Sequence, residues 1–469
     1  MNDIKVIYAS QIGAKLDSNV YSGGGTDDTV ILQSVLDKAI EWGMIHLIMD
    51  GAALVRGLNI HSNTTIECMN KDCGFFLAEQ SNRSIISNYN WDFETIHTKN
   101  ITLIGGTYNQ DCKNQLHHIP NQELNKFAFG NDKWIFGFEF YGVENLTLRD
   151  LTIRNQRTFA FMAANWKHIN IENVWIALPD RMANQNQDGF HFWGPGQFLN
   201  IRNVGGQVGD DFMNIGPDEG DCVSSITDVI IDGVFLDNAD QGIRFLSRGS
   251  GRLDRVIVRN VTGTYNSFGF YINPWFPGET YGNVGNIIFE NIDLRQTKPL
   301  YEYTPPFLFR LGGNIECATF RNIYHHHPID NRSLFQIGIP FYDQNFKNTT
   351  GTTPMMESLL FDGIHIVEND DSALDAEYLQ IKGPIGQFLM RNVEVIRPKN
   401  IEPKGTMIKT FEGCKIDTMI LSGIHAEGMD AFLTAEEGSI ETLNMHDTSV
   451  KNMKRGFLTV KNDVIKNIE

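Results

Sequence analysis

The chain has 469 residues and a formal net charge of −18, with acidic residues outnumbering basic ones by 57 to 39. This balance argues against a nucleic-acid partner, because a polyphosphate is normally met by a basic stripe and the basic residues here are scattered singly. With 41% apolar residues the chain can bury a large core, and it has no unbroken apolar run of the roughly 18 residues that a membrane span needs.

Residues 1–50 are expected to cap the N-terminal end of the fold. No basic stretch followed by an apolar segment is present there, so no signal peptide is expected. A complete chain would be cytoplasmic, and one that had lost a signal would be secreted or periplasmic. Residues 26–43 are expected to form a helix with Thr26 as N-cap and Gly43 at its end. Its apolar face is formed by Ile31, Val35, Leu36, Ala39 and Ile40.

The six cysteines are dispersed and form no C-x-x-C pattern, so we expect small core residues rather than a disulfide framework or a zinc site. They are Cys68, Cys73, Cys112, Cys222, Cys317 and Cys414. No cofactor and no metal is expected.

From residue 146 onward one eight-residue pattern recurs about every 30 residues. Its first members are LTLRDLTI at 146, INIENVWI at 169 and LNIRNVGG at 199. Apolar residues alternate at a spacing of two, which is typical of strands, and the fifth slot holds only Asn, Asp or Gly, the residues that best tolerate a left-handed backbone. The fifth-slot residues are Asp150, Asn173, Asn203, Gly233, Asn260, Asn291, Asn322, Gly363, Asn392, Gly423 and Asp447.

Two short strands joined by one residue with a left-handed backbone form a corner. Because the corner recurs in every period, the chain is expected to wind into a coil. The sequence therefore predicts an all-β fold, a single-stranded right-handed parallel β-helix with an N-terminal capping helix. We expect one domain over 1–469, with coils over about 51–450 and a C-terminal cap at 451–469. Departures from the period at 109–135 and 341–356 are expected loop insertions, which in solenoids often wall a binding face.

Each coil also has a second strand, beginning at 137, 160, 189, 212, 242, 269 and 307. Alternation points its apolar side chains, such as Phe190 and Ile243, inward. The side chains predicted to point outward from these strands are polar and aromatic. A face that is merely solvated would contain mainly Glu and Lys. The outward residues are Glu139, Tyr141, Met162, His191, Trp193, Asn214, Arg244, Tyr271, Asn273 and Arg310.

Acidic residues directly precede three of these strands. Asp188 ends the run N-Q-D at 186–188, Asp210 and Asp211 belong to G-D-D at 209–211, and Asp240 precedes Gln241. Adjacent coils would bring Asp188 within reach of the Asp210/Asp211 pair. Clustered carboxylates repel one another, which raises at least one pKa and leaves an acid beside a base. Cleavage of a glycosidic bond needs that combination.

A calcium site is the main rival interpretation of the three carboxylates, because clustered carboxylates also hold hard cations. The run DEGD at 218–221 would extend such a site, but we expect a solvated loop there. His117, His118 and the run 325–327 are expected to be polar loop residues rather than metal ligands.

These motifs resemble the polygalacturonase-type glycoside hydrolases of family 28, whose pattern is N-T-D, G-D-D, G-H-G and R-I-K on successive coils of a pectinase-like right-handed β-helix. N-Q-D at 186–188 matches with Gln for Thr, and G-D-D at 209–211 matches in full. The runs NQDGFHFWGP and GIRFLS are similar to a divergent bacterial branch. The resemblance extends to about residue 295, and more loosely to about 450. It implies that Asp210 is the general acid and that Asp188 and Asp211 hold the water of an inverting reaction.

The sequence departs from the family pattern at two places. Gln241 stands where the family has its histidine, and Y-I-N at 271–273 lacks both cations that bind a galacturonate carboxylate. A standard polygalacturonase is therefore not expected. Arg244 and Arg310 lie on the same predicted face and would contact an anionic sugar from other positions, since Arg binds carboxylates with two hydrogen bonds. Trp193 and Tyr271 suit stacking on sugar rings.

The sequence predicts a glycoside hydrolase that cleaves a polysaccharide or oligosaccharide, uronate-containing or otherwise anionic, with Asp188, Asp210 and Asp211 as catalytic residues. The expected substrate-binding residues are Asn186, His191, Trp193, Asn214, Gln241, Arg244, Tyr271, Asn273 and Arg310. Two alternatives stay open: a calcium-dependent polysaccharide lyase with a base such as Arg244, and a non-catalytic glycan-binding β-helix. The expected partner is a carbohydrate, without nucleic acid or membrane, and a homo-oligomer is left open.

Overall fold

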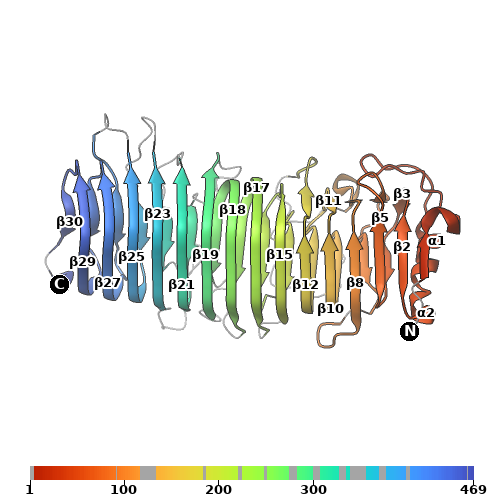
Figure 1. Cartoon of the computed structure of the whole chain (residues 1–469), viewed down its shortest axis with the longest axis horizontal. Coiled ribbons are helices and arrows are strands. Elements are labelled where there is room, and N and C mark those ends of the chain that lie inside the picture. The colour runs from red at the N-terminus through yellow and green to blue at the C-terminus, as the bar shows by residue number, and fades with distance from the viewer. Residues whose placement is uncertain are drawn as a thin grey trace. The chain divides into compact units, whose positions relative to one another are not determined.

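The computed structural model consists mainly of parallel strands (Figure 1). It describes residues 5–90, 92–116, 134–182, 186–219, 224–247, 251–273, 282–298, 307–326, 334–338, 355–368, 377–397, 402–461 and 463–469. The chain forms two compact units, one of Met1–Gly216 with Asp228–Ala239 and one of Pro217–Thr227 with Asp240–Glu469. The predicted right-handed parallel β-helix is confirmed. That the whole chain is one domain stays a prediction.

The first unit begins with a short strand and helical turns: β1 (Lys5–Tyr8), η1 (Ala9–Ile12), α1 (Thr29–Leu36) and α2 (Ala39–Trp42). The N-cap of α1 is Asp28 rather than Thr26, whose hydroxyl donates to Asp17 instead. Asp28 is buried and accepts hydrogen bonds from two backbone amides at residues 15 and 16. The chain turns at residues 37 and 38, so the expected single helix is divided in two. Gly43 ends α2 with a φ of 78°, as expected.

The division of the helix changes which residues are buried. Val35, Leu36 and Ala39 are buried as predicted, together with Leu32. Ile40 is 70% exposed, which contradicts the predicted continuous apolar face. After the turn, the face of α2 no longer follows the periodicity of α1.

Strands of successive coils in the first unit pair in three columns (Figure 1). The first column contains β2 (Ile45–Met49), β5 (Thr64–Cys68), β8 (Thr98–Ile104), the later parts of β10 (Phe138–Arg149) and β12 (Phe161–Glu172), and most of β15 (Gly196–Gly206). The second column contains β3 (Ala52–Val55), β6 (Gly74–Leu77), β9 (Thr107–Asn109), β11 (Thr152–Arg154), β13 (Trp175–Ala177) and the end of β15. The third column contains β4 (Leu58–Ile60), β7 (Ile86–Asn88), the starts of β10 and β12, β14 (Phe190–Trp193) and β16 (Asp211–Gly216). A short η2 turn (Cys112–Asn114) follows β9.

The second unit repeats this arrangement with longer strands. β17 (Ile226–Leu246) contributes residues 228–239 to the first unit and its remaining residues to the second. The long strands are β18 (Leu253–Asn273), β19 (Val284–Gln296), β21 (Ile315–His326), β23 (Met356–Val367), β25 (Pro384–Ile396), β27 (Lys415–Glu427), β29 (Ser439–Lys451) and β31 (Ile465–Ile468). The third column of this unit contains the end of β18, β20 (Phe307–Leu311), β22 (Phe335–Ile337), β24 (Glu377–Ile381), β26 (Thr406–Thr410), β28 (Ala431–Ala435) and β30 (Gly456–Val460).

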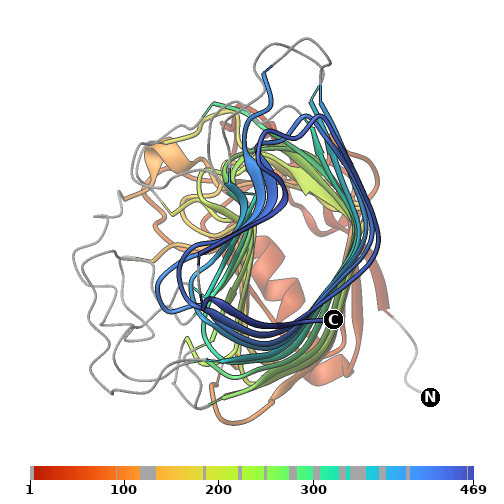
Figure 2. The ribbon, with the colours of Figure 1, turned by 90° about the vertical axis from the view of Figure 1, so that its left-hand side faces the viewer.

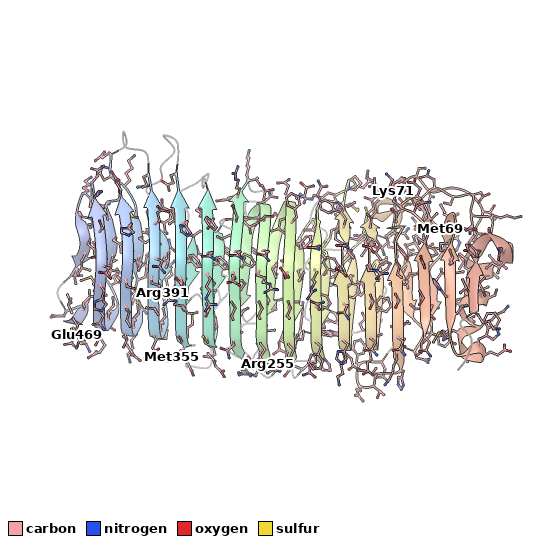
Figure 3. All side chains as sticks on the ribbon, viewed as in Figure 1. Met69, Lys71, Arg255, Met355, Arg391 and Glu469 are labelled. Carbon is pink, nitrogen blue, oxygen red and sulfur yellow. The ribbon has the colours of Figure 1, made fainter. Side chains whose placement is uncertain are left out.

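Each coil turns at the residue that the sequence pattern predicts. All eleven fifth-slot residues have positive φ, from 50° at Asp447 to 80° at Gly233. Their side chains also pair along the stack: Asn291 Nδ2 donates to Asn260 Oδ1 at 3.1 Å, and Asn322 Nδ2 donates to Asn291 Oδ1 at 3.0 Å. Asn392 donates instead to Asp362, which also accepts a hydrogen bond from Arg391 at 2.7 Å. Arg391 is labelled in Figure 3.

The core of each unit lies inside its coils, which overlie one another when viewed along the stack (Figure 2). In the first unit one row of fully buried aliphatic side chains crosses six strands: Leu47, Ile66, Leu103, Leu148, Ile171 and Ile201. In the second unit phenylalanines stack instead, for example Phe309 on Phe335 at 4.8 Å between ring centroids. Burial of each such side chain contributes about 1.5–3 kcal/mol. In the part of the chain that the structure describes, no helix is long and apolar enough to cross a membrane.

Five of the six cysteines lie in described residues, and all five are free thiols. Cys68, Cys73, Cys112 and Cys414 are buried, as predicted for core residues. Cys317 is partly exposed, and Cys222 lies outside the described residues.

Candidate active site

The two acidic segments of the first unit lie on adjacent coils, and their backbones are hydrogen-bonded to each other. Gly209 N donates to Gln187 O at 3.0 Å, and Gly189 N donates to Asp211 O at 2.9 Å. These two bonds flank Asp188 on one coil and Asp210 on the next. Beyond them β14 and β16 continue in parallel register, with His191 opposite Asn214. The 22-residue separation in sequence thus becomes a neighbouring position in the stack, as predicted.

Glycines in these motifs allow the coils to approach closely. A Cβ on Gly189 would lie 2.4 Å from the carbonyl oxygen of Phe212 on the next coil, closer than any side chain tolerates. A Cβ on Gly209 would meet the Gln187 side chain at 3.1 Å, a milder contact. The glycine directly before β14 is therefore required by the packing of adjacent coils.

The three aspartates differ in exposure. Asp188 and Asp211 are buried, at 2% and 3% exposed, whereas Asp210 is only partly buried. Asn186, at the start of the same motif, is also partly buried. Of the three carboxylates, Asp210 is therefore the one that a ligand outside the coil meets first.

A buried histidine holds the Asp188 carboxylate. His191 Nδ1 lies 2.8 Å from Asp188 Oδ2, and both side chains are 3% exposed. The imidazole ring stacks on Phe159, with centroids 4.0 Å apart and planes 5° from parallel, and meets Trp193 edge-on. Asn214, the register partner of His191, is 1% exposed, and its Oδ1 has no hydrogen-bond partner among the described residues.

Two glutamines fix the backbone that carries Asp188. Gln187 Nε2 donates to Gln156 O at 2.7 Å, and Gln156 Nε2 donates to Asp188 O at 3.2 Å. Both side chains are fully buried. Gln156 and Phe159 were not among the predicted site residues. The available signal was spacing, since Gln156 precedes Gln187 by 31 residues, one period of the repeat.

In the first unit, other side chains cover the residues predicted to point outward from the third-column strands. Tyr141, Met162 and Trp193 belong to a buried cluster completed by Phe136, Phe159 and Ala164, against which Phe93 and Trp134 pack. Trp193, expected to stack on sugar rings, is 2% exposed and its ring contacts these neighbours. The covering side chains come from segments outside the repeat pattern, which explains why the sequence did not reveal them.

Glu139 lies two coils before His191 on the same row of the third column. Ser84 Oγ donates to Glu139 Oε2 at 2.6 Å. Burial raises the pKa of this carboxyl group, against the opposing effects of hydrogen bonds from Ser84 and Tyr141. Burial likewise raises the pKa of the Tyr141 phenol.

The remaining predicted binding residues belong to the second unit, where two arginines share an aromatic cluster of Phe268, Tyr271 and Phe307. The Arg244 guanidinium lies over Phe268 at 5.2 Å and donates to Gln241 Oε1. The Arg310 guanidinium lies over Phe307 at 4.8 Å.

Arg310 is further held by two polar side chains. Its Nη1 donates to Tyr271 Oη at 3.1 Å, and its Nε donates to Gln336 Oε1 at 2.8 Å. Burial raises the pKa of Tyr271, although both arginines oppose this shift. The structure therefore brings Gln241, Arg244, Tyr271 and Arg310 into one buried group. The side chain of Asn273 lies outside the described residues.

No group of three His, Cys, Asp or Glu side chains arranged to hold a metal occurs among the described residues. The DEGD run differs from expectation, because Asp218 and Glu219 are buried rather than solvated. His325 is also buried. His117, His118, His327 and most of the insertions at 109–135 and 341–356 lie outside the described residues.

Residues 75–301, which include all four motif positions, match the family model of glycosyl hydrolases family 28. This chain is a β-helix protein that is similar to family 28 over residues 75–301. A polygalacturonase of Gossypium barbadense is 29% identical over 161 residues, which are 34% of the family 28-like chain. The match covers 36% of the cotton protein, so it spans about a third of that relative's length.

Solved structures share the fold of the family 28-like chain. The family 28 exopolygalacturonase of Yersinia enterocolitica gives a TM-score of 0.53 at 12% identity, covering 88% of this chain and 78% of that one. The tailspike protein of E. coli bacteriophage HK620, in complex with a pentasaccharide, gives a TM-score of 0.59 at 9% identity, covering 96% of this chain and 80% of that one. At these identities the likeness concerns the fold alone.

Proposed function

We propose that the family 28-like chain is a glycoside hydrolase that cleaves an anionic, pectin-type polysaccharide or its oligosaccharides. The observation that carries the proposal is the pair of backbone hydrogen bonds that joins residues 187–189 to residues 209–211 inside the family-matching segment. Two carboxylate-bearing motifs are thereby neighbours, which glycosidic cleavage by an acid and a base requires.

The difference in exposure supports distinct roles for the three aspartates. Asp210, partly exposed, acts as the general acid that protonates the leaving oxygen. Asp188 and Asp211 lie deeper and hold the attacking water, with Asp188 oriented by His191 at 2.8 Å. Inversion at the anomeric carbon is expected, as the resemblance to family 28 implies.

Arg244 and Arg310 support an anionic substrate. Each guanidinium is held by an amide side chain and an aromatic ring, so little side-chain entropy is lost when it binds a carboxylate. The family's own cation positions are Tyr271 and Asn273 here, and the second unit contains Arg244 and Arg310 instead. We therefore expect a specificity different from that of a standard polygalacturonase.

The test is incubation of the purified chain with a panel of polygalacturonate, rhamnogalacturonan, alginate and their oligosaccharides, with and without a chelator. If the chain is a hydrolase, its products are saturated and its activity is unchanged by the chelator. If it inverts, NMR detects a first product whose anomeric configuration is opposite to that of the substrate. Asp210→Asn is expected to lower kcat about 10²–10⁴-fold, the usual contribution of a general acid. Asp417→Asn, an exposed position on β27, is the matched control and should leave kcat unchanged.

The same panel separates the alternatives. Products that absorb in the ultraviolet, lost on chelation, would identify a calcium-dependent lyase and contradict hydrolysis. A wild-type chain that binds a glycan but cuts none would identify a non-catalytic glycan-binding protein.

A further inference from the structure

Two aromatic rings lie exposed on the second column of the first unit, on a different strand column from the candidate aspartates. Trp175 begins β13 and is 39% exposed, and Phe235 of β17 is 47% exposed. Their ring centroids are 6.1 Å apart and their planes differ by 22°. Single exposed apolar side chains are common on proteins, but here two stacked and partly exposed rings form one apolar patch.

A glycine between the two rings makes this surface possible. Gly205 is the strand partner of Trp175 on the next coil. A Cβ on Gly205 would lie 2.7 Å from the Trp175 ring and 3.1 Å from the Phe235 Cβ. The indole therefore lies across the glycine backbone, and the two rings come together over a position that has no side chain.

Two polar side chains lie two residues further along the chain from Gly205 and from Phe235. Gln207 Nε2 donates to Asp237 Oδ2 at 2.9 Å, and both residues are partly exposed. Ala177, the corresponding residue on β13, has only a methyl side chain. On the preceding coil Arg154 is the strand partner of Ala177, and its guanidinium lies 5.5 Å from the Tyr21 ring centroid.

We propose that Trp175 and Phe235, with Gln207 and Asp237, form a second glycan-binding surface that holds a polysaccharide chain away from the candidate active site. The C–H face of a pyranose ring is flat and apolar, while its hydroxyl groups need both donors and acceptors. The two rings offer the first kind of contact, and the Gln207–Asp237 pair offers the second.

The small size of the patch favours a glycan over a protein. A stable protein interface buries about 800 Å² on each partner. Two aromatic side chains supply at most about 300–500 Å², and here each ring is less than half exposed. A ligand as narrow as one sugar ring needs no larger contact area than these two rings provide. That the ligand is the substrate polysaccharide rests on the proposed function.

The test compares binding and cleavage in three single variants of the full chain: Trp175→Ala, Phe235→Ala and the control Phe198→Ala. Phe198 is 41% exposed, lies elsewhere on the first unit and stacks on His168. Binding is measured by affinity electrophoresis through gels that contain polygalacturonate, rhamnogalacturonan or dextran. To prevent turnover, each variant also carries Asp210→Asn.

We expect Trp175→Ala and Phe235→Ala to weaken binding to at least one acidic polysaccharide tenfold or more, with Phe198→Ala within twofold of the parent. Trp175→Tyr, which keeps a stacking ring, should retain most of the binding. In chains with Asp210 intact, Trp175→Ala should slow cleavage of the polymer but not of a trisaccharide.

The proposal is overturned if Trp175→Ala binds the polysaccharides as well as the parent chain, which carries Asp210→Asn alone. It is also overturned if no gel slows the migration of the parent chain. A parent dimer that Trp175→Ala converts to a monomer in light scattering overturns it too, because the surface would then be a contact between copies. If no glycan is cleaved but binding depends on Trp175, the proposed hydrolase fails and the binding surface stands. If glycans are cleaved and Trp175 has no effect on binding, the reverse holds.

Discussion

At the scale of single residues, the contact between Asp188 and His191 is the most consequential one in the candidate site. His191 Nδ1 and Asp188 Oδ2 lie 2.8 Å apart, and both side chains are 3% exposed, so their contact is shielded from water. Phe159 fixes the plane of the imidazole ring by stacking on it at 4.0 Å. In the proposed mechanism His191 is therefore a positioning residue, which orients the carboxylate proposed to hold the attacking water.

His191→Phe keeps an aromatic ring against Phe159 but removes the hydrogen bond to Asp188. A hydrogen bond to a charged group contributes about 1.5–3 kcal/mol. We therefore expect kcat to fall about 10–100-fold, since about 1.4 kcal/mol corresponds to tenfold in rate, with KM little changed. His191→Gln, which retains a donor but loses the stacking ring, should be the less impaired variant. Equal kcat in His191→Phe and wild type, each shown to be folded by its melting temperature, would contradict the positioning role.

Two glutamates on β10 should respond to pH with opposite sign. Burial raises the pKa of Glu139 above its ordinary 4.5, whereas the hydrogen bond from Lys99 lowers that of Glu144. The stabilising contribution of protonated Glu139 is present below pH 4.5 and is lost as the pH rises through its raised folded-state pKa. The contribution of Glu144 is present above 4.5 and is lost as the pH falls through its lowered pKa.

Glu139→Gln should therefore gain free energy of unfolding relative to wild type as the pH increases from about 4 to about 8. Glu144→Gln should lose free energy of unfolding relative to wild type over the same range. Urea unfolding of the three proteins at several pH values measures both trends. Parallel curves for Glu139→Gln and wild type would show that ionisation of Glu139 is not coupled to folding.

At the scale of elements, the corner after each first-column strand determines how the coils stack. Asn291 has a φ of 56°, in a region where most L-residues are strained by about 1–2 kcal/mol. Its amide also donates to Asn260 and its oxygen accepts from Asn322. One side chain thus serves both the turn and the contact between coils.

Substituting Asn291 separates these two contributions. Asn291→Gly keeps the left-handed backbone at little cost but loses both hydrogen bonds, whereas Asn291→Ala loses both features. We expect Asn291→Ala to be the less stable variant by about 1 kcal/mol in chemical unfolding. Identical unfolding midpoints would mean that the strain at this corner is relieved in another way.

At the scale of the whole molecule, the fold was predictable because its signal is repeated. Each fifth-slot residue is one of three types, and every one of the eleven has the expected positive φ. The inward row was predictable for the same reason, since Phe190 and Ile243 follow a strict alternation and are fully buried. The helix was less predictable, because the turn at residues 37 and 38 interrupts its periodicity and exposes Ile40.

The candidate site was predictable only in part. The neighbouring positions of Asp188 and the 209–211 segment follow from the period, but the cover over the outward row does not. Trp134 and Phe159 come from segments between strands, whose course no repeat determines. The seventh slot of the repeat contains Thr152, Trp175, Gly205 and Phe235, but only the structure shows that the two rings meet over the glycine.

The row of asparagine side chains in the second unit has a direction. From Asn322 through Asn291 to Asn260 every amide donates the same way, so the side-chain dipoles add head to tail along the stack. The row stops at Gly363, which has no side chain to donate and where an added Cβ would lie 2.9 Å from Asn322 Oδ1. A central amide is polarised from both sides and a terminal one from one side only. The same substitution should therefore weaken the unit more at its middle rung than at its last.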